Sequence, residues 1–115
     1  THSWAYGKEG NKLEGKFIFN ALTTSGTRES YSWDEHNRFP ISSYLIPYNQ
    51  LAHVCRMHFL PPFVMHESGK ADASASARHA KQFKLLLKLF STERPDLEQI
   101  KDLEYLNDYQ VENVL

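Results

Sequence analysis

The segment KFIFNALT, residues 16–23, is the part of the sequence that decides the fold. Its apolar side chains form a nearly continuous run and do not alternate with polar ones. Such a run is typical of a strand whose two faces are both covered, as in a parallel sheet. We therefore expect residues 16–23 to form a buried strand that leads into a long loop, residues 24–40.

A second apolar run, FLPPFVMH, occupies residues 59–66. Pro61 and Pro62 have no N–H to donate to a neighbouring strand, so the strand in this run is expected to begin near Phe63. Between the two runs, residues 42–58 place apolar side chains at helical spacing. Strand, helix and strand in this order form the crossover unit of a parallel sheet, which predicts an α/β fold. The helical face expected to be buried consists of Tyr44, Tyr48, Leu51, Ala52 and Cys55.

A longer helix is expected after the second strand. Asp72 is suited to cap its N-terminus, and the helical pattern continues to Phe90. Lys81, Lys84 and Lys88 fall on one side of this helix, which we expect to face water. The opposite, buried side is expected to consist of Ala80, Phe83, Leu86, Leu87 and Phe90.

The end of the chain differs in charge from the rest, so we divide it into a domain, residues 1–90, and a tail, residues 91–115. Residues 1–92 hold 11 basic and 7 acidic side chains, a net charge of +4, whereas residues 93–115 hold 2 and 7, a net charge of -5. Apolar residues recur every three positions in the tail, which predicts a weak amphipathic helix docked on the basic body or on a partner. These residues are Leu97, Ile100, Leu103 and Leu106.

The composition limits the classes of protein to which this chain can belong. Its 115 residues suffice for one modest domain, and a hydrophobic content of 41% allows a packed core. The net charge of -1 argues against nucleic acid as a partner. Cys55, the only cysteine, cannot form an internal disulfide, which suits a reducing cytosol, and no apolar run is long enough to span a membrane. We therefore expect a soluble, cytoplasmic protein.

Two strands are too few for a stable open sheet, because one face or edge of each would stay uncovered. Natural proteins rarely expose an unpaired strand edge. We therefore expect the chain to complete its sheet with an additional N-terminal segment or with a second copy of itself.

The loop that follows the first strand is the candidate ligand site. Ligands of open parallel sheets bind just beyond the carboxyl ends of the strands. Thr23, Thr24, Ser25 and Gly26 would offer hydroxyls and free backbone N–H groups at such an end. Further along the loop, Tyr31 adds a phenol and His36 adds a group that titrates near neutral pH. These groups suit a flat heterocycle with polar edges or a phosphate.

Without a family resemblance, the residues of this loop favour a simpler interpretation than a ligand site. The loop matches no motif of fixed spacing, so the residues themselves favour a plain polar turn with an exposed His36. His53, Cys55 and His58 could suggest a metal, but histidines five residues apart do not share a helical face. No metal site is expected, and Cys55 is interpreted as a small core residue.

Five stretches change this balance: HSWAYG, LEGK, LTTSG followed by ESY, CRMHFLPPF and ARHAKQF. Their order and spacing resemble the flavodoxin-like NAD(P)H:quinone oxidoreductases, in particular the bacterial ancillary subunits of glutathione-gated potassium efflux systems. The resemblance extends from residue 2 to about residue 90 and concerns only the C-terminal part of that family's domain. It implies the C-terminal half of a flavodoxin-like parallel sheet with flanking helices.

The resemblance also implies an activity and a set of site residues. The family binds FMN or FAD, accepts hydride from NAD(P)H and reduces quinones by two electrons. Thr23, Thr24, Ser25 and Gly26 match the loop that holds the edge of the flavin ring, with Ser25 in place of a glycine. Tyr31 and His36 match the residues that stabilise charge on the flavin during hydride transfer.

The partners implied are a quinone, a second copy of the chain in a homodimer, and a membrane potassium-efflux transporter. The location implied is the cytoplasm, either free or peripheral at the inner face of the cell membrane. The family's phosphate-binding half is absent from these residues, so this chain is not expected to hold FMN tightly by itself. The alternative function is a non-catalytic regulatory or binding module that keeps the flavodoxin-like fold.

Overall fold

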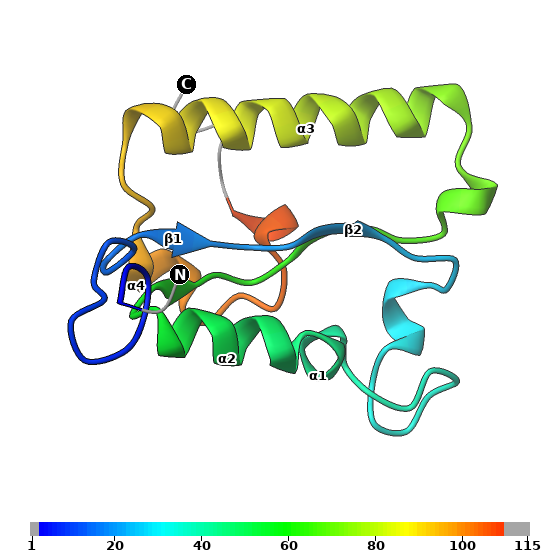
Figure 1. The fold of residues 1–115 in the computed structure, drawn as a ribbon. Coiled ribbons are helices and arrows are strands. Elements are labelled where there is room, and N and C mark those ends of the chain that lie inside the picture. The colour runs from blue at the N-terminus through cyan, green and yellow to red at the C-terminus, as the bar shows by residue number, and fades with distance from the viewer. Residues whose placement is uncertain (1–2, 110–115) are drawn as a thin grey trace.

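The structure is a computed structural model that describes residues 3–109. Its centre consists of short strands joined in two parallel pairs (Figure 1). Strand β1 (Phe17–Ile18) pairs with β3 (His58–Phe59), and β2 (Ala21–Thr23) pairs with β4 (Phe63–Met65). Both pairings are parallel, which confirms the predicted crossover unit. The expected start of the second strand near Phe63 holds for β4 alone, because pairing already begins before the prolines, at His58 in β3.

The predicted first strand, residues 16–23, is interrupted in its middle, between β1 and β2. The interruption lies opposite Pro61 and Pro62, which have no N–H to donate to the ladder. On either side the ladder is continuous, because the Leu60 N–H donates to the Ile18 carbonyl (2.9 Å) and the Phe63 N–H donates to the Asn20 carbonyl (2.9 Å). The two short pairs are therefore parts of one two-stranded ribbon with a proline gap.

The segment between the strands forms two helices, α1 (Ile41–Tyr44) and α2 (Ile46–Val54), where one helix over residues 42–58 was expected. Pro47 lies in the first turn of α2, where its missing N–H costs little. The helix ends early because Arg56 adopts a left-handed backbone with φ of 59°. His58 belongs instead to β3, so the predicted end of the helix is wrong.

The buried face of these helices also differs from the prediction. Tyr44, Tyr48 and Leu51 are each about half exposed, at 51%, 48% and 50% of their accessible surface. The segment carries apolar side chains on two faces, and periodicity alone does not decide which of them packs against the sheet. The residues that pack inward are Ile41, Leu45, Ala52 and Cys55.

Helix α3 (Ala73–Thr92) lies on the opposite side of the strands from α1 and α2, so the molecule has three layers (Figure 1). Asp72 caps it as predicted, since its carboxylate accepts from the Ala75 N–H (2.7 Å). Leu86 and Leu89 are buried. The three lysines face water as expected, whereas Leu87 and Ala80 are exposed, contrary to the prediction.

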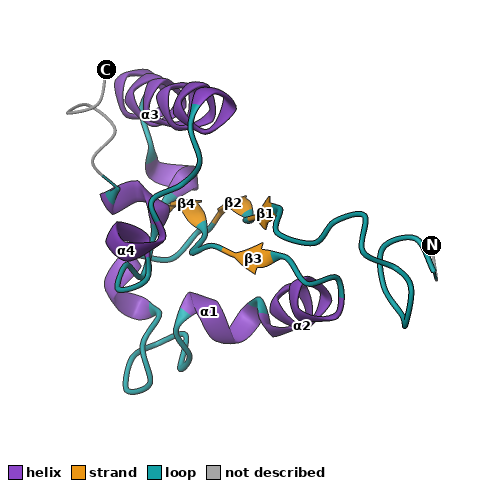
Figure 2. Cartoon of the chain, turned by 90° about the vertical axis from the view of Figure 1, so that its left-hand side faces the viewer, coloured by secondary structure: helices purple, strands orange, loops and turns teal. Residues whose placement is uncertain are grey.

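The tail is not one amphipathic helix. Within its described residues it forms a single turn, α4 (Leu97–Ile100), and a 3₁₀ turn, η3 (Leu106–Asp108), beside β4 (Figure 2). Ile100, Tyr105 and Leu106 belong to the core, because they are at most 2% exposed, whereas Leu97 is 38% exposed. One core cluster consists of Leu60, Phe63, Leu86, Leu89, Ile100, Leu106 and Tyr109.

The two edges of the ribbon differ in how their backbone groups are hydrogen-bonded. On the outer edge of β4, the Asn107 side-chain amide replaces a neighbouring strand: its Oδ1 accepts from the Val64 N–H (2.9 Å) and its Nδ2 donates to the Val64 carbonyl (2.7 Å). The Leu106 N–H donates to the Pro62 carbonyl (2.8 Å). Within the described residues no strand pairs with the other edge, formed by β1 and β2. None of the helices in this part of the chain is long and apolar enough to cross a membrane.

Candidate functional site

The carboxyl ends of β2 and β4 meet because the strands are parallel, and the loops that follow them are bonded together. The Thr24 N–H donates to the Met65 carbonyl (2.9 Å), and the Thr24 carbonyl accepts from the Ser68 N–H (2.9 Å). The Glu67 N–H donates to the Gly26 carbonyl (3.1 Å), and Glu67 has a left-handed backbone with φ of 53°. Residues 24–26 are thus fixed by the second strand and its loop.

Thr24 is buried, and its polar groups are used within the protein. Its hydroxyl donates to the Gly26 carbonyl (3.0 Å) and lies 3.0 Å from Nδ1 of His66. Its carbonyl also accepts from the Ser68 hydroxyl (3.1 Å). The side chain therefore shapes the loop, whereas its neighbours Thr23 and Ser25 are exposed.

Gly26 allows the loop to fold back on itself. A Cβ at this position would lie 2.7 Å from Nδ2 of Asn37 and 2.9 Å from the hydroxyl of Ser30, closer than real contacts allow. Those two side chains are bonded to each other, since Asn37 Nδ2 donates to the Ser30 hydroxyl (2.7 Å). A side chain at position 26 would therefore have to displace this Asn37–Ser30 pair.

Tyr31 and His36, the two predicted catalytic residues, occupy different surroundings. Tyr31 is half-buried, and its ring contacts those of Tyr44 (centroids 6.0 Å apart) and His66 (5.8 Å). His36 is exposed on the far part of the loop. Within the described residues no hydrogen bond or ring contact joins Tyr31 to His36.

His66 is the site residue that the sequence reasoning missed. Its Nε2 is buried and has no hydrogen-bond partner among the described residues, and its ring stands edge-on to that of Tyr105 (5.2 Å). Burial lowers the pKa of His66, and the nearby charge of Arg28 lowers this pKa further. The signal was available, because His66 directly follows the second parallel strand, where ligand-facing residues gather.

Arg28 links this loop to the tail. Its guanidinium donates to the Asp108 carboxylate, with Nη2 2.6 Å from Oδ2, and lies over the Tyr105 ring at 4.5 Å from the centroid. The hydrogen bond that Arg28 donates to the Asp108 carboxylate raises the pKa of Arg28. Burial, followed by the charge of Glu104, raises the pKa of Tyr105 to about 12, so its phenol stays protonated.

The histidines predict how stability depends on pH. Burial holds the pKa values of His66 and His79 below the usual 6.5, so the unfolded chain takes up protons first as the pH falls. Stability is therefore expected to decrease as the pH drops through about 6.5 and to level off below the folded pKa values. Urea midpoints at roughly pH 7.5 and pH 5 measure this, and His66→Gln should reduce the difference. His53→Gln, at an exposed position on α2, is the matched control, and an equal reduction there would refute the explanation.

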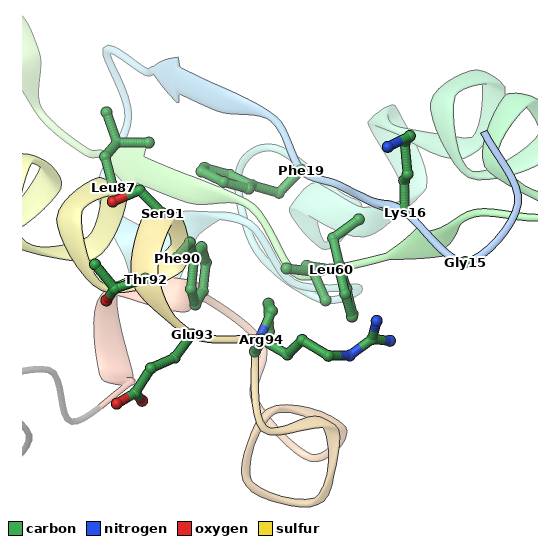
Figure 3. Close-up of a pocket in the computed structure, with 12 residues that line it drawn as sticks. Gly15, Lys16, Phe19, Leu60, Leu87, Phe90, Ser91, Thr92, Glu93 and Arg94 are labelled. Atoms are coloured by element: carbon green, nitrogen blue, oxygen red, sulfur yellow. The ribbon is translucent and has the colours of Figure 1, made fainter. Parts of the chain in front are cut away.

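Two surface hollows lie near opposite ends of the strands. One, of about 400 Å³, lies beside the loop and is lined by Trp33, Phe39, Ser43, Tyr44 and Ile46. The other, of about 520 Å³, lies at the opposite end, between β1 and the end of α3 (Figure 3). Phe19, Leu60, Leu87 and Phe90 give it apolar walls, and Arg94 lies over the Phe17 ring, 4.9 Å from its centroid.

From the sequence, no metal site is expected at His53, Cys55 and His58, and Cys55 is interpreted as a core residue. Cys55 is buried and free, which confirms its prediction as a core residue. In residues 3–109 no three His, Cys, Asp or Glu side chains lie close enough to hold a metal ion.

Comparison with known proteins places the chain in a family. A family model described as flavodoxin-like fold matches residues 1–87. A relative from Shigella flexneri serotype 5b (strain 8401), the glutathione-regulated potassium-efflux system ancillary protein KefG, is 35% identical over 83 residues, which are 72% of this chain and 45% of that protein. The chain thus spans about half the length of the curated relatives that it matches.

Solved structures agree with the family match. General stress protein 14 from Treponema denticola, in complex with FMN, is 27% identical with a TM-score of 0.69, covering 76% of this chain and 50% of that one. An NADPH-quinone reductase from P. pentosaceus, at 22% identity and a TM-score of 0.66, covers 75% of this chain and 51% of that one and shares the fold. Because the matched residues, 1–87, make up most of its length, the chain belongs to the flavodoxin-like fold family.

Proposed function

We propose that the chain is the C-terminal part of a flavin-dependent NAD(P)H:quinone oxidoreductase, with FMN or FAD held partly by residues 23–26. The observation that carries this proposal is the loop at the carboxyl ends of β2 and β4, the position at which flavodoxin-like sheets bind ligands. The FMN present in the Treponema neighbour supports a flavin as the ligand.

The groups available at the loop fit the edge of a flavin ring. Thr23 and Ser25 are exposed, and within the described residues the backbone N–H groups of Ser25 and Gly26 make no hydrogen bond. Such donors can bond the carbonyl oxygens of a flavin ring edge and stabilise negative charge that develops there. Thr24 would act indirectly: its hydroxyl does not face the ligand but holds the Gly26 carbonyl in place. When bound, the flavin supplies the hydride chemistry.

Tyr31 and His36 are proposed to stabilise charge on the flavin, as the family resemblance implies. The Tyr31 ring lies beside that of His66 at the inner end of the loop, with centroids 5.8 Å apart. His36 is exposed, so its role requires that the ligand or a partner chain reach the outer part of the loop.

The rest of the binding site would come from additional polypeptide. The open edge of β1 and β2 and the apolar hollow at Phe19 and Phe90 are the surfaces where a further part of the domain would pack. We propose that the complete protein is a homodimer, uses NAD(P)H and a quinone, and serves a potassium-efflux transporter at the inner face of the membrane. The name of the KefG relatives, ancillary proteins of a potassium-efflux system, supports the transporter partner.

The alternative is a regulatory module that keeps the fold without catalysis. Two observations favour it: the Thr24 hydroxyl is used inside the protein, and His36 is exposed on the far part of the loop. Catalytic variants can separate the two functions.

Two variants are expected to behave differently in this chain joined to the N-terminal half of a KefG relative. Thr24→Val removes the bond to the Gly26 carbonyl and should weaken FMN retention, whereas Thr24→Ser, the matched control, keeps the hydroxyl and the affinity. His36→Gln should leave FMN bound but slow its reduction by NAD(P)H about a hundredfold, the effect of losing a donor worth about 3 kcal/mol. Stopped-flow absorbance measures reduction and fluorescence titration measures retention. Parent-like reduction in His36→Gln would favour the regulatory module.

A further inference from the structure

The last described turn of the tail touches two parts of the candidate site at once. Asn107 bonds the outer edge of β4 at Val64, and its carbonyl accepts from Gln82 Nε2 of α3 (2.6 Å). The next residue, Asp108, bonds Arg28 on the loop that follows β2. A single turn therefore ties the loop to the sheet and to α3.

The contact with the loop constrains orientation as well as distance. Both guanidinium nitrogens of Arg28 meet the Asp108 carboxylate, at 2.6 Å for Nη2 with Oδ2 and 3.3 Å for Nη1 with Oδ1. The face of the guanidinium lies on the Tyr105 ring. Both side chains are about two-fifths exposed, at 43% and 42%, so the orientation comes from the fork geometry and the Tyr105 ring and not from burial. Arg28 opens the short 3₁₀ helix η1 (Arg28–Ser30), two residues after Gly26, so fixing it fixes the path of the loop.

A second line of contacts reaches the inner part of the loop. Tyr105, which is 1% exposed, stands edge-on to His66. His66 in turn bonds the Thr24 hydroxyl, which holds the Gly26 carbonyl. The tail thus supports the loop from outside through Asp108 and from inside through Tyr105.

We propose that tail residues 105–108 form a clamp that holds the loop of residues 24–37 in its ligand-binding shape, with Asp108 as a positioning residue. These tail residues lie beyond the range matched by the family model, residues 1–87. The proposal depends on the proposed function only for the identity of the ligand.

Amide hydrogen exchange of the full 115-residue chain, followed by NMR, tests the clamp. Asp108→Asn keeps the size of the side chain and removes its charge. Exchange is expected to increase about fivefold at loop amides such as Ser30, Tyr31 and Asn37, while amides in the middle of α3 keep the parent rate. Glu98→Gln is the matched control, because it removes the exposed tail ion pair with Lys101 (2.9 Å) and should change nothing in the loop.

Two further variants show whether the fork itself positions the loop. Asp108→Glu keeps a carboxylate and should retain most of the protection, whereas Arg28→Lys keeps the charge without the fork and should loosen the loop as Asp108→Asn does. Unchanged loop exchange in Asp108→Asn, or an equal increase across α3, would overturn the clamp.

Titration with FMN distinguishes the clamp from the flavin assignment. In the chain joined to the N-terminal half of a KefG relative, Asp108→Asn should weaken FMN binding by about the same factor, fivefold, as it increases loop exchange. If the parent form binds no FMN while loop exchange still increases in the variant, the clamp stands and the flavin assignment fails. If FMN binds equally well to parent and variant although the loop has loosened, the clamp does not position the ligand site and the proposal is overturned.

Discussion

A chain that ends at Thr92 is expected to lose its cooperative unfolding transition. The deletion removes Ile100, Tyr105, Leu106 and Tyr109, all of which are buried in the core. Burying a large apolar side chain contributes about 1.5–3 kcal/mol, so the four together contribute roughly 6–12 kcal/mol. A whole domain is typically stable by only about 5–15 kcal/mol. The loss is therefore as large as the stability itself.

Circular dichroism during thermal and urea unfolding measures this result. The matched control keeps the full length and neutralises three exposed acids of the tail, Glu98→Gln, Asp102→Asn and Glu104→Gln, and it should unfold close to the parent. This comparison separates burial from charge, since exposed ion pairs are worth little. A truncated chain that melts cooperatively within a few degrees of the parent would show that the tail is not part of the core.

Asn107→Ala is expected to lower the free energy of unfolding by about 4 kcal/mol, the second largest effect. The Val64 N–H and carbonyl lose their partners on the outer edge of β4, and Val64 is 1% exposed. Each buried polar group left without a partner costs about 1–3 kcal/mol. Urea unfolding measures the change.

Two variants control for the loss of an amide. Asn49→Ala removes the same group at an exposed position on α2 and should stay within about 0.5 kcal/mol of the parent. Asn107→Asp keeps an acceptor for the Val64 N–H but places a carboxylate beside the Val64 carbonyl, so it should be destabilised as well. If Asn107→Ala unfolds like Asn49→Ala, the amide does not close the edge of the sheet.

Features with a local signal could be predicted from the sequence. The continuous apolar run at residues 16–23 and the prolines at 61 and 62 determine the strands, and Asp72 determines the start of α3. Their parallel pairing follows from the helix between them. The family resemblance and the family match agree over the same part of the chain.

Features that depend on distant contacts could not be predicted in this way. Helices α1 and α2 present apolar residues on two faces, and only packing selects Leu45 over Tyr44 for the interior. From the sequence, Asn107 is an ordinary loop residue, and its role at the edge of β4 depends on the folded structure. The clamp between Arg28 and Asp108 joins residues 80 positions apart, and no local pattern indicates it.

The same limit applies to the site. The hydroxyls of residues 23–25 were predicted together as ligand groups, yet Thr24 turns inward to His66 while Thr23 and Ser25 stay exposed. That division depends on how the loops after β2 and β4 cross, which is a property of the folded sheet. It also brings His66, which is absent from the predicted site, into ring contact with Tyr31.

We propose that residues 23–26 form one edge of a flavin site in a flavodoxin-like domain of which this chain is a part. Fluorescence titration of FMN into this chain joined to the N-terminal half of a KefG relative tests this assignment, with circular dichroism to confirm that the protein is folded. Saturable quenching with one FMN bound per chain is expected, and weaker quenching in Thr24→Val than in Thr24→Ser. A folded protein that leaves FMN fluorescence unchanged would show that residues 23–26 are not part of a flavin site.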